Sequence, residues 1–176
     1  MFKGNLVRLR TFTEGDVLKA YSFMNDYEVI KNVNADAIFP TSLDEEEKFI
    51  FSEQEKYNLC YDFAIETLES MEFIGCCSVK DTNFKDRTCG IGIIIGNKDY
   101  WGKSYGEDAI RVLLKFIFNE LNFRKVKLSV FDFNKRAINC YKKIGFIREG
   151  ILKQEIYREG QYHDVINMAI FKNDCI

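Results

Sequence analysis

The feature that most constrains the fold is a β-rich segment that passes through a short polar loop directly into a long amphipathic helix. The segment covers residues 88–96, and the loop runs from Gly96 to Gly106. Beyond the loop, apolar residues recur at three- and four-residue spacing over 110–121, which places them on one helix face. A strand that leads into a helix N-terminus presents unpaired N–H groups and the positive end of the helix dipole. This arrangement predicts a site for a phosphorylated ligand.

The rest of the chain predicts a mixed sheet flanked by helices. β-rich segments predict strands at residues 6–10, 61–67, 72–80, 88–96, 126–132, 146–157 and 162–171. Besides the central helix, the pattern predicts three further helices. One begins near Thr13, and a second runs from Leu43 to Glu55 after a Ser42/Glu45 capping box. The third runs from Lys135 to Ile144, with Asn134 as its N-cap and Gly145 at its end. We therefore expect a single domain over residues 1–176 with an α+β (three-layer α/β) fold and about seven mostly antiparallel strands.

Composition excludes several classes of protein. The chain has 176 residues, 47% of them apolar, and a net charge of −2. This length supports one full core, and the near-neutral charge gives no footprint for nucleic acid. No apolar run approaches the ~18 residues of a membrane span. The six cysteines form no C-x-x-C pair and accompany a single histidine. A zinc site is therefore not expected, and free thiols in a cytoplasmic protein are the simplest interpretation.

Two kinds of phosphate binder fit the loop. The first is a P-loop nucleotide-binding protein, because Gly102-Lys103-Ser104 has the G-K-S sequence of that motif. The spacing disagrees, since G-x-x-x-x-G-K-[ST] requires a glycine at position 97, where Asn97 stands. The preceding segments also look like antiparallel hairpins, whereas P-loop folds use parallel β-α-β units. The P-loop interpretation is the weaker alternative.

The second kind is an acyltransferase that uses coenzyme A. Residues Trp101–Gly106 resemble the pyrophosphate motif Q/R-x-x-G-x-G/A of the GNAT superfamily of N-acetyltransferases, with Trp101 at the first position and Ser104 at the first glycine. Residues Asn134–Phe146 resemble the second family signature, N-x-x-A-x-x-x-Y-x-K-x-G-F, at nearly every position. Three further segments look like the RimJ/RimL branch of the family: Leu9-Arg10, Pro40-Thr41-Ser42 and Gly160–Asp164. The layout is also similar to that of spermidine/diamine acetyltransferases.

The resemblance implies that an amine attacks acetyl-CoA directly, without an acyl-enzyme. The acceptor would be a protein N-terminus or a small amine such as a polyamine, and a homodimer would be typical of the family. A catalytically silent acyl-CoA sensor is the alternative from another class. No metal is implied. The cofactor-binding residues carried over are Ile93, Ile94, Ile95, Trp101, Gly102, Lys103, Ser104, Tyr105, Gly106, Glu107, Asn134 and Ala137.

In the same resemblance, Tyr141 is the general acid that protonates the leaving thiolate. A phenol with a pKa near 10 keeps its proton at neutral pH and can give it to a strong base. Gly92 is expected at a bulge that starts the separation of two strands. The general base stays open among the acidic residues 44–47, His163 and Asp132, each of which also has an ordinary structural role. Three cysteines are expected to be small apolar fillers: Cys76, Cys77 and Cys140.

Overall fold

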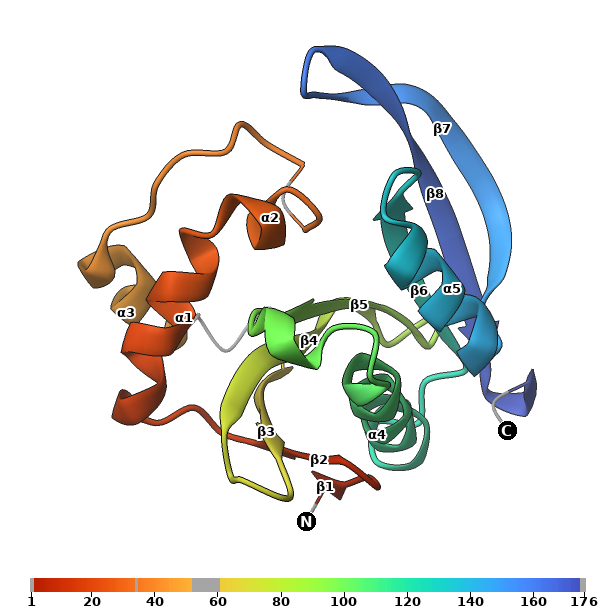
Figure 1. Ribbon diagram of the computed structural model, residues 1–176. Coiled ribbons are helices and arrows are strands. Elements are labelled where there is room, and N and C mark those ends of the chain that lie inside the picture. Colours follow the sequence, from red (N-terminus) through yellow and green to blue (C-terminus); the bar gives the residue numbers. More distant parts are fainter. Residues whose placement is uncertain (1, 34, 52–60, 175–176) are drawn as a thin grey trace.

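The protein folds into one eight-stranded sheet with helices on both faces (Figure 1). The computed structural model describes residues 2–33, 35–51 and 61–174. The strands follow the order β1-β2-β3-β4-β5-β6-β8-β7 across the sheet. Their bounds are β1 (Phe2–Lys3), β2 (Val7–Arg10), β3 (Tyr61–Thr67), β4 (Phe73–Asn83), β5 (Thr88–Ile95), β6 (Lys125–Phe131), β7 (Ile147–Arg158) and β8 (Gln161–Phe171). The α-helices are α1 (Val17–Met24), α2 (Tyr27–Ile30), α3 (Leu43–Phe51), α4 (Tyr105–Asn119) and α5 (Lys135–Ile144).

One parallel pair divides the sheet into two halves. All other neighbouring strands are antiparallel, but β5 and β6 run parallel because α4 carries the chain from one to the other. Their pairing joins only Thr88–Gly90 to Lys125–Lys127. Beyond Gly90 the two strands separate, as Figure 1 shows. The far part of β5, residues 91–95, therefore faces a gap instead of a partner strand.

The predicted bulge at Gly92 is wrong, although the separation it was meant to explain is present. The β4–β5 register runs unbroken through the Ser78–Gly92 pair, and its irregularity lies between Lys80 and Asn83. A glycine still has a use here, because a Cβ at Gly92 would lie 3.2 Å from Ser78 Oγ. The missing side chain leaves room for Ser78 on this face of the sheet.

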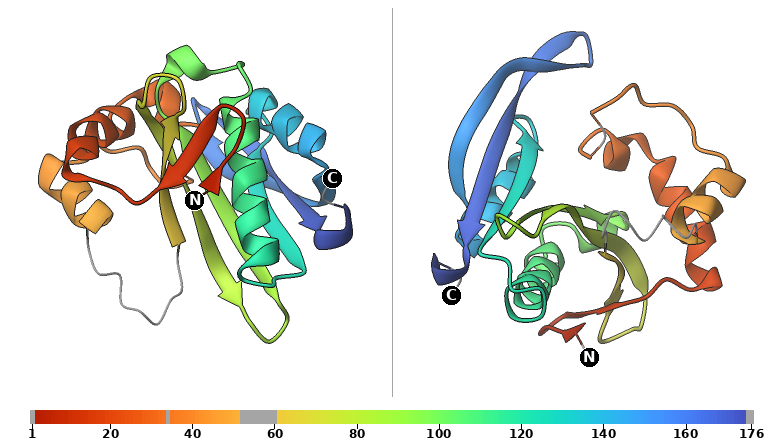
Figure 2. Two further views of the ribbon diagram at one scale, coloured as in Figure 1. Left: turned by 90° about the horizontal axis from the view of Figure 1, so that it is seen from below. Right: turned by 180° about the vertical axis from the view of Figure 1, so that it is seen from behind.

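The main core lies between the sheet and α4. Leu113, Leu114 and Ile117 are fully buried in it, as the predicted apolar stripe requires. Residues of α5 join the same core, so α4 and α5 cover one face. A second, smaller core of Ala20, Ala64 and Phe73 lies under α1 and α3. Figures 1 and 2 show β3 and β4 between these two helices and α4.

One buried carboxylate ties the N-terminal strands to α4. The Asp108 side chain is 8% exposed. It accepts hydrogen bonds from the backbone N–H groups of Asn5, Leu6 and Val7 at 3.0, 2.7 and 3.0 Å. Three otherwise unpaired donors are thus satisfied by one residue of the first turn of α4.

Most predicted elements are confirmed. The Ser42/Glu45 capping box is formed, and Asn134 accepts the N–H of Ala137 at 3.1 Å at the start of α5. Gly145 ends α5 with φ +114°, in the left-handed region. Neither β1 nor the short helix α2 was predicted from the sequence. The predicted end of the helix at Glu55 lies outside the described residues. Among the described residues, no helix is long and apolar enough to cross a membrane.

Candidate active site

A large cleft passes through the gap between β5 and β6. Its volume is about 1080 Å³, at the upper end for small-molecule sites, and it reaches from α5 to the helices on the opposite face of the sheet. One side is lined by β5, the loop at 101–107 and α5, and the other by α1, α3 and the open faces of β3 and β4. A single cleft therefore has room for a large cofactor and a second substrate.

The tip of the β7–β8 hairpin contacts the residues at and after α2. Lys31 Nζ lies 3.2 Å from a Glu159 carboxylate oxygen, and the Arg158 guanidinium donates to the backbone oxygen of Asp36 at 3.2 Å. Figure 1 shows this hairpin reaching toward the segment after α2. These contacts link the C-terminal hairpin to the segment that follows α2, and sequence patterns did not indicate them.

The loop before α4 supplies backbone donors to the cleft. In the described part of the chain, no acceptor pairs with the N–H groups of residues 102–107. Ser104 has φ +65° and ψ +4°, so it takes the left-handed conformation that glycine adopts without strain. Free amides at the start of a helix make a strong anion site. The loop thus has the geometry that a diphosphate requires.

Two residues of the predicted loop site do not reach the cleft. Lys103 is exposed and lies outside the lining. The Tyr105 ring packs edge-on against Tyr100, with the centroids 4.7 Å apart. The other predicted members of this loop do line the cleft: Trp101, Gly102, Ser104, Gly106 and Glu107.

Trp101 connects the two sequence motifs. Its indole N–H donates to the backbone oxygen of Ile95, at the end of β5, over 2.6 Å. The Arg136 guanidinium lies over the indole ring, 3.5 Å from its centroid. Both residues line the cleft. Sequence reasoning did not single out Arg136, because nothing in the pattern shows that an α5 side chain stacks on the loop.

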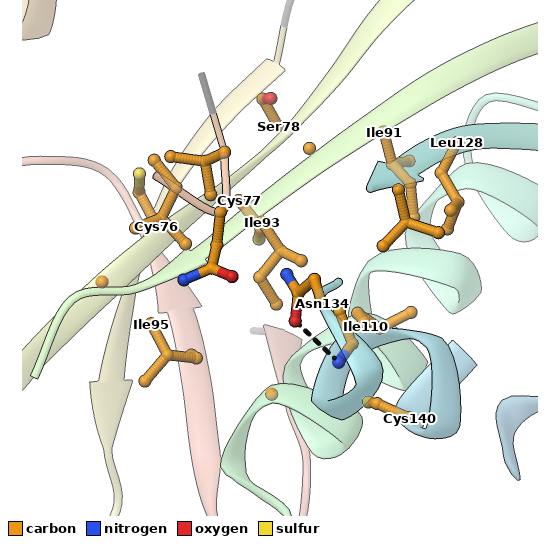
Figure 3. A pocket seen from close by; sticks show the side chains of 18 of the residues that line it. Cys76, Cys77, Ser78, Ile91, Ile93, Ile95, Ile110, Leu128, Asn134 and Cys140 are labelled. Atoms are coloured by element: carbon orange, nitrogen blue, oxygen red, sulfur yellow. Dashed lines mark hydrogen bonds between the residues drawn. The ribbon is translucent and has the colours of Figure 1, made fainter. Parts of the chain in front are cut away.

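The predicted β5 and α5 residues meet in the same cavity (Figure 3). Ile93, Ile94 and Ile95 line it beside the gap, and Asn134 and Ala137 line it from the start of α5. The Asn134 side chain is buried, and its oxygen is occupied by the Ala137 N–H. Asn134 therefore acts as the helix cap and still leaves its amide NH₂ group for a ligand.

Tyr141 lies at the inner wall of the cleft. The residue is 8% exposed, and its ring packs against Phe146 with the centroids 5.7 Å apart. Burial raises the pKa of the Tyr141 phenol above its usual value, because a phenolate would lose its hydration there. The group therefore stays protonated at neutral pH and is available as a proton donor.

The opposite part of the cleft carries carboxylates. Glu46 on α3 is 5% exposed and lines the cleft together with Asp62 on β3. Burial raises the pKa of Glu46, and desolvation also raises the pKa of Asp62, although part of that residue reaches solvent. The sequence left residues 44–47 open as a general base or as complements of the helix dipole, and it did not distinguish the buried member from the exposed ones.

The cysteines are placed as fillers. Burial raises the pKa of the Cys76 thiol to about 12 and that of Cys140 to about 11, which makes both poor nucleophiles. His163 lies outside the cleft lining, and its Nδ1 is 3.1 Å from an Asp132 carboxylate oxygen. Its ring also contacts Phe133. This setting supports the structural role for His163 and Asp132.

Known proteins are similar to this chain in sequence and in fold. The sequence model of the GNAT acetyltransferase domain matches residues 7–147. A prophage-derived uncharacterized N-acetyltransferase of Bacillus subtilis is 28% identical over 171 residues, 97% of this chain and 93% of that protein. A spermidine N(1)-acetyltransferase of Escherichia coli is 34% identical over 105 residues, 60% of this chain and 56% of that protein.

Solved structures agree with the sequence matches. The spermidine N-acetyltransferase of Vibrio cholerae, crystallised with CoA and spermine, superposes with a TM-score of 0.85 and 26% identity over 96% of each chain. A matched family domain of this extent also removes the basis for the P-loop alternative. The chain belongs to the GNAT family of acetyltransferases and is an N-acetyltransferase that uses acetyl-CoA as its co-substrate.

Proposed function

We propose that the protein acetylates a small cationic amine of the polyamine kind. The observation that carries this proposal is the single cleft that runs from the β5–β6 gap to the carboxylates Glu46 and Asp62. An acceptor with several ammonium groups fits such a wall, because opposite charges attract strongly where water is scarce. The relatives named for spermidine point to the same class of acceptor.

Coenzyme A would bind along the first half of the cleft. The free amides of residues 102–107 would hold its diphosphate, and Arg136 would add a charge-assisted contact. The pantetheine arm would lie beside the free part of β5, residues 91–95, in the manner of an added strand. This position brings the thioester into the gap between β5 and β6.

Tyr141 would act as the general acid. The acceptor loses a proton to water in the cleft, and the neutral nitrogen attacks the thioester carbonyl carbon. The tetrahedral intermediate then collapses, the C–S bond breaks, and the thiolate takes the phenol proton of Tyr141. A second proton leaves the new amide nitrogen, and the phenol is reprotonated. A backbone N–H of residues 93–95 would stabilise the intermediate oxyanion, a contribution of roughly 3 kcal/mol in other enzymes.

Thiol release during turnover tests this proposal. The wild-type protein is incubated with acetyl-CoA and a panel of spermidine, 1,4-diaminobutane, an aminoglycoside and a peptide with a free N-terminus. The proposal expects the highest kcat/KM for the polyamines. A preference for the peptide would contradict it and favour the protein N-terminus that the sequence left open.

A matched substitution tests the role of Tyr141. Tyr141→Phe removes only the hydroxyl, so the affinity for CoA should stay within about twofold while kcat falls about 100-fold or more, as for the loss of a general acid. Unchanged kcat would exclude Tyr141 as the acid.

Because four described cysteines carry free thiols, a reducing compartment such as the cytoplasm is the proposed location. The homodimer stays a prediction.

A further inference from the structure

Glu46 is a buried carboxylate in the cleft lining, and no residue that the structure describes pairs with it. The residue is 5% exposed, and no described side chain or backbone N–H donates a hydrogen bond to its carboxylate. Glu46 lines this cleft together with Cys76 on β4. A buried carboxylate without a cationic partner destabilises the folded protein. A ligand that placed a cation beside it would therefore bind with a favourable free energy from that pairing.

The surface between Glu46 and the gap is a shallow row of small residues. Asp62 on β3 pairs with Ser78 on β4, which pairs with Gly92 on β5. All three residues line the cleft on the face covered by α1 and α3. Two strand spacings, about 10 Å, separate the first residue of this row from the last. An extended aliphatic chain can lie across Ser78 and Gly92 with one end in the gap and the other near Asp62.

We propose that Glu46, with Asp62, binds a second ammonium group of the acceptor while the first enters the β5–β6 gap. The inference rests on the proposed function and makes it more specific: the protein selects amines that carry at least two positive charges on one flexible chain. Lys80 also lines this face and lies near Gly92, its Nζ 3.9 Å from the position of a Cβ there. The positive charge of Lys80 repels a second ammonium group close to the gap. The second ammonium group is therefore more stable farther from the gap, near Glu46.

Steady-state kinetics with matched amines test the proposal. 1,8-Diaminooctane and n-octylamine have the same chain length, which is enough to span the row of about 10 Å, and they differ by one ammonium group. We expect Glu46→Gln to raise KM for the diamine about 10- to 100-fold, the cost of one charged hydrogen-bonded contact. KM for n-octylamine and both kcat values should change less than about twofold. The control is Glu47→Gln, because Glu47 is exposed on the same helix. Equal effects on both amines, or no effect on either, would overturn the proposal.

Direct binding separates this inference from the proposed function. If the wild-type protein acetylated no amine, the proposed function would fail, but calorimetry with spermidine would still decide the role of Glu46. Heat with the wild type that is lost in Glu46→Gln supports the inference, and no heat with the wild type overturns it. A second variant, Glu46→Leu, should also raise Tm, because it removes an unpaired buried charge. A lower Tm would mean that the carboxylate has a structural partner and would overturn the inference.

Discussion

Ser104 offers a sharp test of how the cofactor loop is built. It holds φ +65° and ψ +4° at the position directly before α4, and its side chain makes no capping hydrogen bond. A residue with a Cβ is strained in this conformation, whereas glycine is not. The GNAT motif that the loop resembles has glycine at this place. Ser104→Gly should therefore stabilise the protein.

The expected gain follows from two opposing terms. Relief of the left-handed strain is worth about 1–2 kcal/mol. Glycine also has more freedom in the unfolded chain, which costs about 0.5–1 kcal/mol. The net gain is about 0.5–1 kcal/mol, which for a chain of this size raises Tm by about 1–4 °C. Because the loop is already in this conformation, the affinity for CoA should change less than about twofold.

Thermal unfolding and calorimetry with CoA measure both quantities. Ser104→Ala is the matched control, because it removes the hydroxyl and keeps the Cβ, so its Tm should stay close to that of the wild type. A fall in Tm for Ser104→Gly, or an equal rise for both variants, would refute the strain argument. A loss of CoA affinity in both variants would instead assign the hydroxyl a direct contact with the cofactor.

Three other substitutions test separate parts of the structure. Arg136→Gln should weaken CoA binding about 10-fold by calorimetry, with exposed Lys135→Gln as the control, and equal affinities would contradict the role given to Arg136. Asp108→Asn should lower the free energy of unfolding in urea by about 2–4 kcal/mol, because it loses charge-assisted acceptors for three backbone donors; an unchanged midpoint would count against that anchor. Burial raises the pKa of Tyr141. Its phenol therefore ionises first in the unfolded chain, and wild-type stability should fall relative to Tyr141→Phe above about pH 10, by up to ~1.4 kcal/mol per pH unit. Parallel stability curves from pH 8 to 11 would refute this.

Local patterns predicted the elements whose causes are local. The apolar stripe of α4 exists because one helix face meets the core, and its members from Ile110 to Phe118 are buried as expected, whereas Leu121 lies beyond the end of α4 and is partly buried. Asn134 and Gly145 mark the ends of α5 through their own hydrogen bond and backbone conformation. The two family motifs then placed most of the predicted cofactor residues in one cleft.

The features that the sequence did not indicate depend on contacts between distant segments. The stack of Arg136 on Trp101 and the bond from Trp101 to Ile95 require three elements to meet, and no residue pattern encodes their distance. The buried state of Glu46 depends on how α3 packs against the sheet, which helical periodicity does not specify among neighbouring acidic residues. The separation of β5 from β6 was expected, but at Gly92 its stated cause was wrong, because the β4 register is continuous there.

The central claim is that the amides of residues 102–107 hold a diphosphate while the free part of β5 lies beside the pantetheine. Amide chemical shifts of ¹⁵N-labelled protein during a titration with CoA test both parts at once. We expect the largest chemical-shift changes at residues 91–95 and 101–107. When pantetheine replaces CoA, the changes at residues 101–107 should become much smaller, while those at residues 91–95 should persist. Chemical-shift changes confined to other residues, with residues 91–95 and 101–107 unaffected by CoA, would contradict the claim.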